Sequence, residues 1–133
     1  MCIRDSIGAA IASGSYPVAG MIVAPCSIRT LSAIAWGQLD NLLARAADVQ
    51  LKERRRLVLL VRESPLHLGH LRSMLQATEI GAIIAPPMPA FYLKPQSMDE
   101  VIDQIAARAI NLLDLPRLRA PAKIWSGPGS EGE

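Results

Sequence analysis

A run of five apolar residues, at positions 57–61 (LVLLV), lies in the middle of the chain between a basic stretch and the charged pair Arg62-Glu63. Apolar and polar side chains do not alternate along this run, which favours a strand that is covered on both faces. Strands of this kind occur inside parallel sheets that have helices above and below. The pattern therefore predicts a central parallel strand at residues 57–61.

Two shorter apolar segments predict further strands, at residues 20–24 (GMIVA) and 81–85 (GAIIA). Pro25 follows the first segment and has no N–H to donate to a sheet, so we expect that strand to end before it. The second segment runs into residues 86–92 (PPMPAFY), whose prolines favour an extended chain over a helix or a central strand. We expect residues 86–92 to form a lid or a wall of a site.

Helical periodicity appears between the first two predicted strands. Ser27 is a suitable N-cap for a helix that stops at Gly37. The buried face of this helix is expected to hold Leu31, Ile34 and Ala35. Asp40 is expected to cap a second, short helix that carries Arg45 toward its end, where a cation answers the helix dipole.

Two more helices follow the central strand. Ser64-Pro65 combines a capping side chain with a proline at the first helical position, which predicts a helix from there to Gly81. Its buried stripe is expected to consist of Leu68, Leu71 and Leu75. The last helix opens with a capping box at residues 97–100 (SMDE). Its apolar face is expected to hold Val101, Ile102, Ile105, Ala109, Leu112 and Leu113. Arg108 projects at the border of that face, so we expect it to have an anionic partner.

The order strand, helix, helix, strand, helix, strand, helix predicts an α/β fold with a parallel sheet. We expect one domain at residues 7–115, which begins with the end of a helix at residues 7–12. Residues 1–6 (MCIRDS) are interpreted as a non-native leader. Residues 116–133 are rich in proline, glycine and charge, which predicts a flexible tail except around Trp125.

Composition excludes several classes of protein. The net charge is only +2, with two Trp, two Tyr and one Phe, so neither a basic surface nor a set of base-stacking rings indicates a nucleic-acid partner. No stretch approaches the roughly 18 apolar residues of a membrane span. The apolar opening stretch is broken by residues 13–17 (SGSYP), unlike a signal peptide. The two cysteines, Cys2 and Cys26, cannot build a disulfide framework, which favours a reduced, cytoplasmic location.

Candidate chemistry lies where the predicted strands end. Arg62 and Glu63 follow the central strand, at the edge of the sheet where open α/β folds bind their ligands. The turn at residues 25–27 (PCS) precedes a helix, and the free N–H groups of such a turn suit a phosphate. His67 and His70 are three residues apart, but the chain has no other histidine. They are interpreted as surface or capping residues, and no metal site is expected.

Three segments together resemble the flavin prenyltransferases of the UbiX family. They are residues 20–35 (GMIVAPCSIRTLSAIA), 40–75 (DNLLARAADVQLKERRRLVLLVRESPLHLGHLRSML) and 80–108 (IGAIIAPPMPAFYLKPQSMDEVIDQIAAR). The specific feature is the combination of RAAD, LKERR, the strand followed by RESP, and PAFY. The resemblance implies a Rossmann-like or flavodoxin-like fold and assembly as a dodecamer. It also implies transfer of a dimethylallyl group from dimethylallyl phosphate to reduced FMN. The product would be the prenylated flavin that UbiD-type decarboxylases use.

The resemblance also implies roles for particular residues. The FMN-binding residues would be Ser27, Ile28, Arg29, Thr30 and Arg62. Tyr92 and Arg108 would grip the prenyl phosphate, with Lys52 and Arg45 as further cations on the phosphate side. Glu63 would be the acidic residue beside the flavin, with a role in handling protons. Clustered cations and a tyrosine suit this reaction because they stabilise the negative charge of the departing phosphate. Arg54 and Arg55 are interpreted as the solvated part of the basic run.

The chain departs from the family pattern mainly at its amino end. It lacks the first strand, the glycine- and serine-rich loop that holds the flavin phosphate, and an acidic residue after it. We therefore expect residues 1–133 alone to bind FMN weakly or not at all, to associate or aggregate through exposed apolar surface, and to make no prenylated flavin. Smaller departures are Ile28-Arg29 where Met-Lys is common, Trp36 where a small or polar residue is usual, and Lys94 where His or Arg is common.

Two alternatives stay open from the sequence. The flavin-dependent cysteine decarboxylases share the fold and a similar turn, but they need a catalytic histidine before this region and a PxMN-type segment, where this chain has residues 86–92 (PPMPAFY). The other alternative is a non-catalytic module for flavin binding or assembly. The sequence leaves open whether a monophosphate or a diphosphate is the donor, and which decarboxylase is served.

Overall fold

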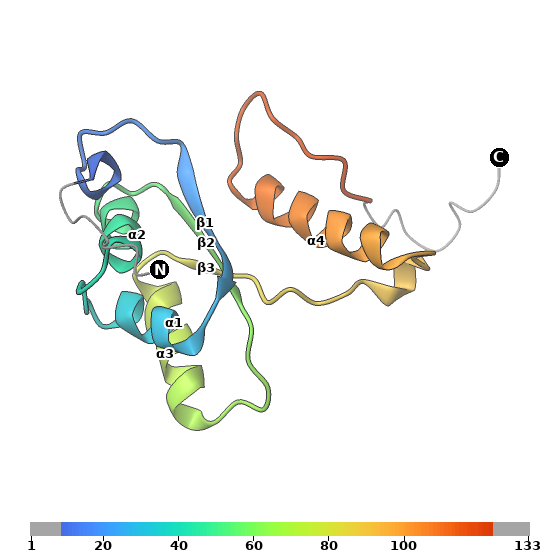
Figure 1. The fold of residues 1–133 in the computed structure, drawn as a ribbon, viewed down its shortest axis with the longest axis horizontal. Helices are drawn as coiled ribbons and strands as arrows, with labels where there is room; N and C mark the ends of the chain where they lie inside the picture. Colours follow the sequence, from blue (N-terminus) through green and yellow to red (C-terminus); the bar gives the residue numbers. More distant parts are fainter. Residues whose placement is uncertain (1–8, 124–133) are drawn as a thin grey trace, which may run out of the picture.

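A computed structural model describes residues 9–123 and contains a three-stranded parallel sheet between helices (Figure 1). The strands are β1 (Gly20–Cys26), β2 (Arg56–Val61) and β3 (Ile83–Ile84), and their spatial order is β1-β2-β3. The helices are α1 (Ile28–Ala35), α2 (Leu42–Lys52), α3 (Leu68–Glu79) and α4 (Met98–Leu112), with 3-10 helices η1 (Ala10–Ala12) and η2 (Phe91–Leu93). The predicted α/β class with a parallel sheet is confirmed.

Strand β2 is the centre of the fold, as its apolar run predicted. It pairs with β1 on one side and with β3 on the other. One face of β2 presents Leu57, Leu59 and Val61 to the core formed with α1, α2 and α3. The other face presents Val58 and Leu60 to α4. Because successive side chains point to opposite faces, one apolar strand fills both cores.

The prediction that β1 ends before Pro25 is wrong, because the strand continues to Cys26. Its pairing with β2 is regular from Gly20 to Val23, is interrupted, and resumes where Cys26 lies opposite Val61. Within residues 9–123 β1 is an edge strand, so a proline that lacks an N–H is tolerated at the irregular position.

Helix α1 forms as predicted, whereas α2 forms with a different cap and a greater length than predicted. The Ser27 side chain accepts a hydrogen bond from the N–H of Thr30 (3.2 Å), and the predicted face of α1 is buried. Helix α2 is capped by Asn41 rather than Asp40, since the Asn41 side chain accepts from the N–H of Ala44 (2.9 Å). Arg45 therefore lies in the first turn of an 11-residue helix and not toward its end.

The predicted start of α3 at Ser64-Pro65 is also wrong. Helix α3 begins at Leu68, because the Nδ1 atom of His67 accepts from the N–H of Gly69 (3.0 Å) and caps the helix. His67 is thus a capping residue, as expected. The predicted buried stripe is exposed, with exposed fractions of 59% for Leu68, 48% for Leu71 and 59% for Leu75.

Helix α3 instead buries a face of small residues. Its buried members are Ser73 and Ala77, and the Ser73 hydroxyl accepts a hydrogen bond from the Nε1 atom of Trp36 (3.3 Å). Small side chains let α3 pack closely against α1, with which it shares most of its helix contacts. The leucines are consequently directed away from this interface.

Helix α4 is capped by Ser97, whose side chain accepts from the N–H of Glu100 (3.2 Å). The Glu100 carboxylate accepts from the N–H of Gln96 (2.9 Å), so the second bond of the predicted capping box reaches one residue further back. Ala107 and Ala109 are the buried residues of α4, while Ile102, predicted to be buried, is 55% exposed.

The helix end predicted at residues 7–12 is the 3-10 helix η1 within the described part of the chain. Residues 1–6, interpreted as a non-native leader, and Trp125, expected to be an ordered part of the tail, lie outside the described residues. Across residues 9–123 no helix has both the length and the apolar content needed to cross a membrane.

Candidate functional site

The carboxyl ends of β1 and β2 lie side by side, with Cys26 opposite Val61. The backbone N–H of Arg62 donates to the carbonyl of Cys26 (3.1 Å), so Arg62 lies beside the turn that leads into α1. The first N–H groups of α1, those of Ile28 and Arg29, precede the first intrahelical hydrogen bond and have no carbonyl of the helix to bind. This corner can therefore accept an anionic group.

The hydroxyls at this turn form a pair. Ser27 donates to the Oγ1 atom of Thr30 (3.1 Å) while its own oxygen accepts from the Thr30 N–H. Because the Thr30 oxygen is used as an acceptor, its hydroxyl hydrogen remains for a ligand. The structure thus brings together Ser27, Ile28, Arg29, Thr30 and Arg62, the five residues predicted to bind FMN.

Cys26 lies next to this corner without being a reactive group. Its side chain is fully buried, and burial raises the pKa of the thiol to about 11. The thiol is therefore protonated at neutral pH, and a protonated thiol is a poor nucleophile. Cys26 contributes packing to the core between the sheet and α1.

Glu63 directly follows Arg62 and is exposed. Its Oε1 atom accepts from the N–H of Ser64 (3.0 Å), which fixes the carboxylate close to the end of β2. The side chain of Arg62 is also exposed, and no ion pair engages it within residues 9–123. Both side chains therefore lie at the edge of the sheet where open α/β folds commonly bind ligands.

A cavity of about 430 Å³ lies against α4 at the same edge of the sheet. Tyr92 from η2 and Arg108 from α4 line it, so the structure brings the two predicted phosphate-binding residues together. Residues 86–92, predicted to form a lid or a site wall, contribute Pro86, Met88 and Ala90 to the lining of this cavity. We call this space the basic cavity. Its other lining residues are Leu60, Ala85, Gln104, Ile105, Ala109, Asn111, Leu112, Arg119, Ala122 and Lys123.

Arg119 and Lys123 were not predicted for the site. Both lie beyond α4, in a segment whose composition predicted flexibility. The available signal was the pair of cations in the sequence RLRAPAK, residues 117–123, which follows closely on the helix that carries Arg108. Composition alone could not show that this segment returns along α4.

An apolar groove adjoins the basic cavity and has a volume of about 440 Å³. It shares Leu60, Ile105 and Ala109 with that cavity. Its remaining lining residues are Ile22, Ala24, Pro87, Ile102, Ala106 and Ile110. A polar ligand with a short hydrocarbon chain could therefore place its two ends against walls of matching chemistry.

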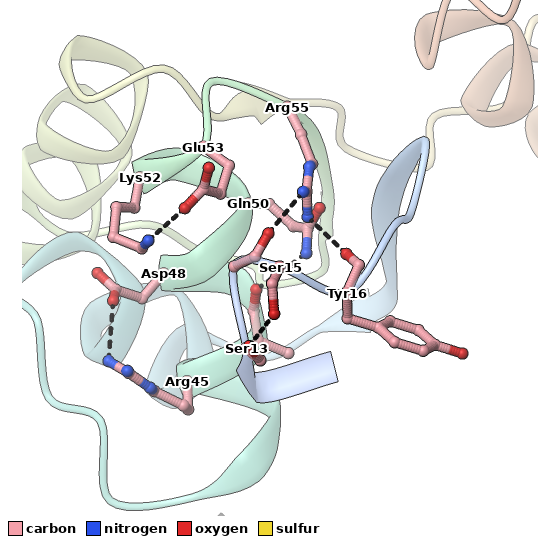
Figure 2. A network of polar contacts seen from close by, with 11 residues as sticks. Ser13, Ser15, Tyr16, Arg45, Asp48, Gln50, Lys52, Glu53 and Arg55 are labelled. Carbon is pink, nitrogen blue, oxygen red and sulfur yellow. Dashed lines mark hydrogen bonds and ion pairs between the residues drawn. The ribbon is translucent and has the colours of Figure 1, made fainter. Parts of the chain in front are cut away.

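The structure separates Arg45 and Lys52 from these residues. Both lie on α2, which packs with α1 and α3 on the face of the sheet opposite α4 (Figure 1). Arg45 pairs with Asp48 (3.4 Å), and Lys52 pairs with Glu53 (Figure 2). The hydrogen bond and the charge of Lys52 lower the pKa of the Glu53 carboxyl. Within one chain, Arg45 and Lys52 do not reach the basic cavity.

Arg55 is also placed differently from the prediction that it is solvated. Its guanidinium donates to the carbonyl of Gly14 (2.8 Å) and to the carbonyl of Tyr16 (3.1 Å; Figure 2 labels Arg55 and Tyr16). These bonds tie the segment between η1 and β1 to the end of α2. Arg55 is therefore a structural residue.

No group of three or more His, Cys, Asp or Glu side chains in residues 9–123 is arranged to hold a metal ion. The rings of His67 and His70 lie with their centroids 3.6 Å apart and are tilted by 33°, and His67 already uses Nδ1 to cap α3.

Comparison with known proteins places the chain among flavoproteins. The family model described as Flavoprotein matches residues 5–114. The chain is 62% identical over 124 residues to the flavin prenyltransferase UbiX of Salmonella typhimurium, an alignment that covers 93% of this chain and 65% of that protein. The chain thus spans less than two thirds of the length of this relative.

Solved structures give the same picture. The structure of AnUbiX (PadA1) in complex with FMN and dimethylallyl pyrophosphate matches with a TM-score of 0.88 and 49% identity, covering 93% of this chain and 65% of that chain. A dodecameric FMN-dependent UbiX-like decarboxylase from Escherichia coli O157:H7 matches with a TM-score of 0.86 and 44% identity, covering 93% and 66%.

Proposed function

Because this chain belongs to the Flavoprotein family, we propose that it is the main part of a flavin prenyltransferase. The enzyme would transfer a dimethylallyl group from dimethylallyl phosphate to reduced FMN and supply the prenylated flavin to a UbiD-type decarboxylase. The observation that carries the proposal is the basic cavity, which unites Tyr92 and Arg108 beside an apolar groove. The similarity to the Salmonella flavin prenyltransferase supports it and favours this reaction over cysteine decarboxylation or a non-catalytic role.

FMN fits the corner formed by the ends of β1 and β2. The N–H groups at the start of α1 and the Thr30 hydroxyl can donate to its polar atoms, and Arg62 lies beside them. Bound FMN would supply the nucleophilic ring that accepts the allyl group. Glu63 follows Arg62 and is fixed through Ser64, which suits a carboxylate that moves a proton near the ring.

Tyr92 and Arg108 would bind the phosphate of the donor. The guanidinium of Arg108 has no carboxylate partner within residues 9–123, so its charge is available to a ligand. A cation and a phenol that contact the phosphate stabilise the negative charge that grows as the allylic carbon–oxygen bond breaks. The hydrocarbon end would lie toward Leu60 and Ile105, where the basic cavity meets the apolar groove.

If Arg45 and Lys52 also act on the phosphate, they must come from another copy of the chain, because α2 and α4 lie on opposite faces of the sheet. This agrees with a homo-oligomer, for which the dodecameric relative supplies the precedent. The exposed leucines of α3, Leu68, Leu71 and Leu75, are the surface that we assign to contact between copies. An apolar stripe of this kind is typical of a helix that another chain covers.

We further propose that residues 7–115 form the flavoprotein domain. The low cysteine content supports a cytoplasmic location.

The proposal is tested with two proteins, the 133-residue chain and the same chain extended by the amino-terminal segment of the Salmonella relative. We expect FMN titration, followed by flavin fluorescence, to show weak or no binding for the first and tight binding for the second. The extended chain, given reduced FMN and dimethylallyl phosphate, should yield a flavin whose mass is raised by one dimethylallyl group. Failure of the extended chain to bind FMN would contradict the proposal.

Arg108→Ala in the extended chain separates the phosphate site from the flavin site. FMN should stay bound while prenyl transfer falls by about a hundredfold, because losing a charge-assisted hydrogen bond costs about 1.5 to 3 kcal/mol. Arg117→Ala, which removes an exposed cation outside the basic cavity, is the matched control and should retain activity. Undiminished turnover by Arg108→Ala at subsaturating donor would show that Arg108 is not the phosphate ligand.

A further inference from the structure

Two of the three cations that line the basic cavity come from the segment beyond α4. Arg108 belongs to the helix, while Arg119 and Lys123 belong to the chain that follows it. None of the described residues that line this cavity is an Asp or a Glu. A partly enclosed space with three cations and no carboxylate in its wall is stabilised by an anionic ligand.

This segment is held on α4 by two side-chain amides. Asn111 exchanges two hydrogen bonds with the backbone of Ala120 (2.8 and 3.0 Å). Gln104 exchanges two with the backbone of Lys123 (2.8 and 2.9 Å). Because Gln104 and Asn111 are seven residues apart, they lie about two turns apart on the same side of α4. The backbone that carries the two cations is therefore fixed beside Arg108.

The charges of these cations are only partly balanced by carboxylates: Lys123 also lines a neighbouring pocket that contains Glu100 and Asp103, without an ion pair to either. Arg119 pairs with Asp114 (3.4 Å), but the same carboxylate also pairs with Arg56 (3.6 Å). The carboxylate of Asp114 is thus shared by the guanidinium groups of Arg56 and Arg119. The ammonium of Lys123 has no carboxylate partner among residues 9–123, and neither has Arg108.

We propose that Arg119 and Lys123 bind phosphoryl oxygens of the prenyl donor together with Tyr92 and Arg108. Asn111 and Gln104 are positioning residues that hold the segment in place. The inference rests on the proposed function and extends it, because the phosphate of the donor is then bound by the segment after α4 as well as by η2 and α4. The segment at residues 119–123 becomes part of the substrate site.

The test is titration calorimetry of dimethylallyl phosphate into the chain extended by the amino-terminal segment of the Salmonella relative, without flavin. Arg119→Ala and Lys123→Ala should each weaken binding at least fivefold, and the double variant more than either. Arg117→Ala removes the same charge from the same segment but lies outside the basic cavity, so its affinity should stay within twofold of the unsubstituted extended chain. Far-UV circular dichroism of each variant checks that the fold is retained.

Positioning is tested with Asn111→Leu, which removes no charge. This variant should weaken dimethylallyl phosphate binding, and adding Arg119→Ala to it should cause little further loss, because the segment is already released. Independent, multiplicative losses would mean that Asn111 does not act through the segment.

The proposal is overturned if the unsubstituted extended chain does not bind dimethylallyl phosphate, or if Arg117→Ala weakens binding as much as Arg119→Ala and Lys123→Ala do. The assay contains no flavin, so its result is independent of prenyl transfer. Failure of the proposed function would appear differently. The extended chain would then bind dimethylallyl phosphate, but it would not bind FMN and would not make a prenylated flavin.

Discussion

Arg54 and Arg55 are neighbours in a basic run, yet their environments differ. Arg54 has a positive φ of 58° at the end of α2, while Arg55 donates two hydrogen bonds to carbonyls about forty residues earlier in the chain. Sequence reasoning treats both as solvated because each is a cation in a charged stretch. The difference comes from the segment before β1, which passes close enough for only one of them to reach.

Arg55→Ala should therefore lower the free energy of unfolding by about 1 to 3 kcal/mol, since two carbonyls lose a charged donor. Arg54→Ala should change it by less than about 0.5 kcal/mol, as is usual for an exposed position without such bonds. Urea unfolding followed by circular dichroism measures both. Equal losses in the two variants would mean that the basic run acts through its overall charge.

Cys26 makes the free energy of unfolding depend on pH in the alkaline range. Burial raises the pKa of its thiol from 9.0 to about 11, so the unfolded chain loses this proton at a lower pH than the folded chain. The contribution of the Cys26 thiol to the free energy of unfolding is therefore complete below pH 9 and is lost as the pH rises through about 11. A shift of this size corresponds to about 2 to 3 kcal/mol.

Cys26→Ala should remove that part of the pH dependence. The measurement is urea unfolding at pH 8 and at pH 10.5 for both proteins, compared as a difference because lysines and tyrosines titrate in the same range. An identical change with pH in the two proteins would show that the thiol titrates equally in the folded and unfolded states.

At the scale of the elements, α3 shows where a sequence pattern and a structure diverge. Leu68, Leu71 and Leu75 recur at the spacing of a buried stripe, and that spacing is the usual signal for the core face of a helix. In the structure the core face carries Ser73 and Ala77, since small side chains let α3 approach α1. The pattern correctly indicated an apolar face but could not show that this face lies outside the core of the chain.

The double variant Leu71→Glu/Leu75→Glu in the extended chain should reduce the size of the oligomer, because it places charges in an apolar contact. Stability of the isolated chain should change little, as both leucines are half exposed. Light scattering after size-exclusion chromatography measures the mass. Gln76→Glu, on the same helix but outside the stripe, is the control, and an unchanged mass for the double variant would exclude this surface.

At the scale of the whole molecule, the connections explain why the two groups of cations are apart. The strands follow one another in sequence order, and right-handed crossovers in one direction place α1, α2 and α3 on the same face of the sheet. The chain after β3 then returns over the other face as α4. Arg45 and Lys52 thus fall on one side, and Arg108 on the other.

The sequence allowed the parallel sheet and the central strand to be predicted, and it singled out Tyr92 and Arg108, which line the same cavity. Five consecutive apolar residues leave few alternatives to a strand buried on both faces, and family resemblance linked the two site residues. The basic cavity's other cations, Arg119 and Lys123, could not be predicted, because their position depends on four hydrogen bonds from Asn111 and Gln104. Local composition carries no information on such tertiary bonds.

The edge position of β1 has a consequence for the exchange of backbone hydrogens with solvent. Within residues 9–123 β1 pairs with β2 alone, whereas β2 is paired on both sides. Alternate N–H groups of a parallel strand point to opposite neighbours, so every second amide of β1 faces no strand. In deuterated water these amides should exchange early, whereas the amides of β2 should exchange only through global unfolding. A residue-by-residue alternation of fast and slow exchange along β1 would thus record which side of the sheet is open, and it would fade once another strand paired there.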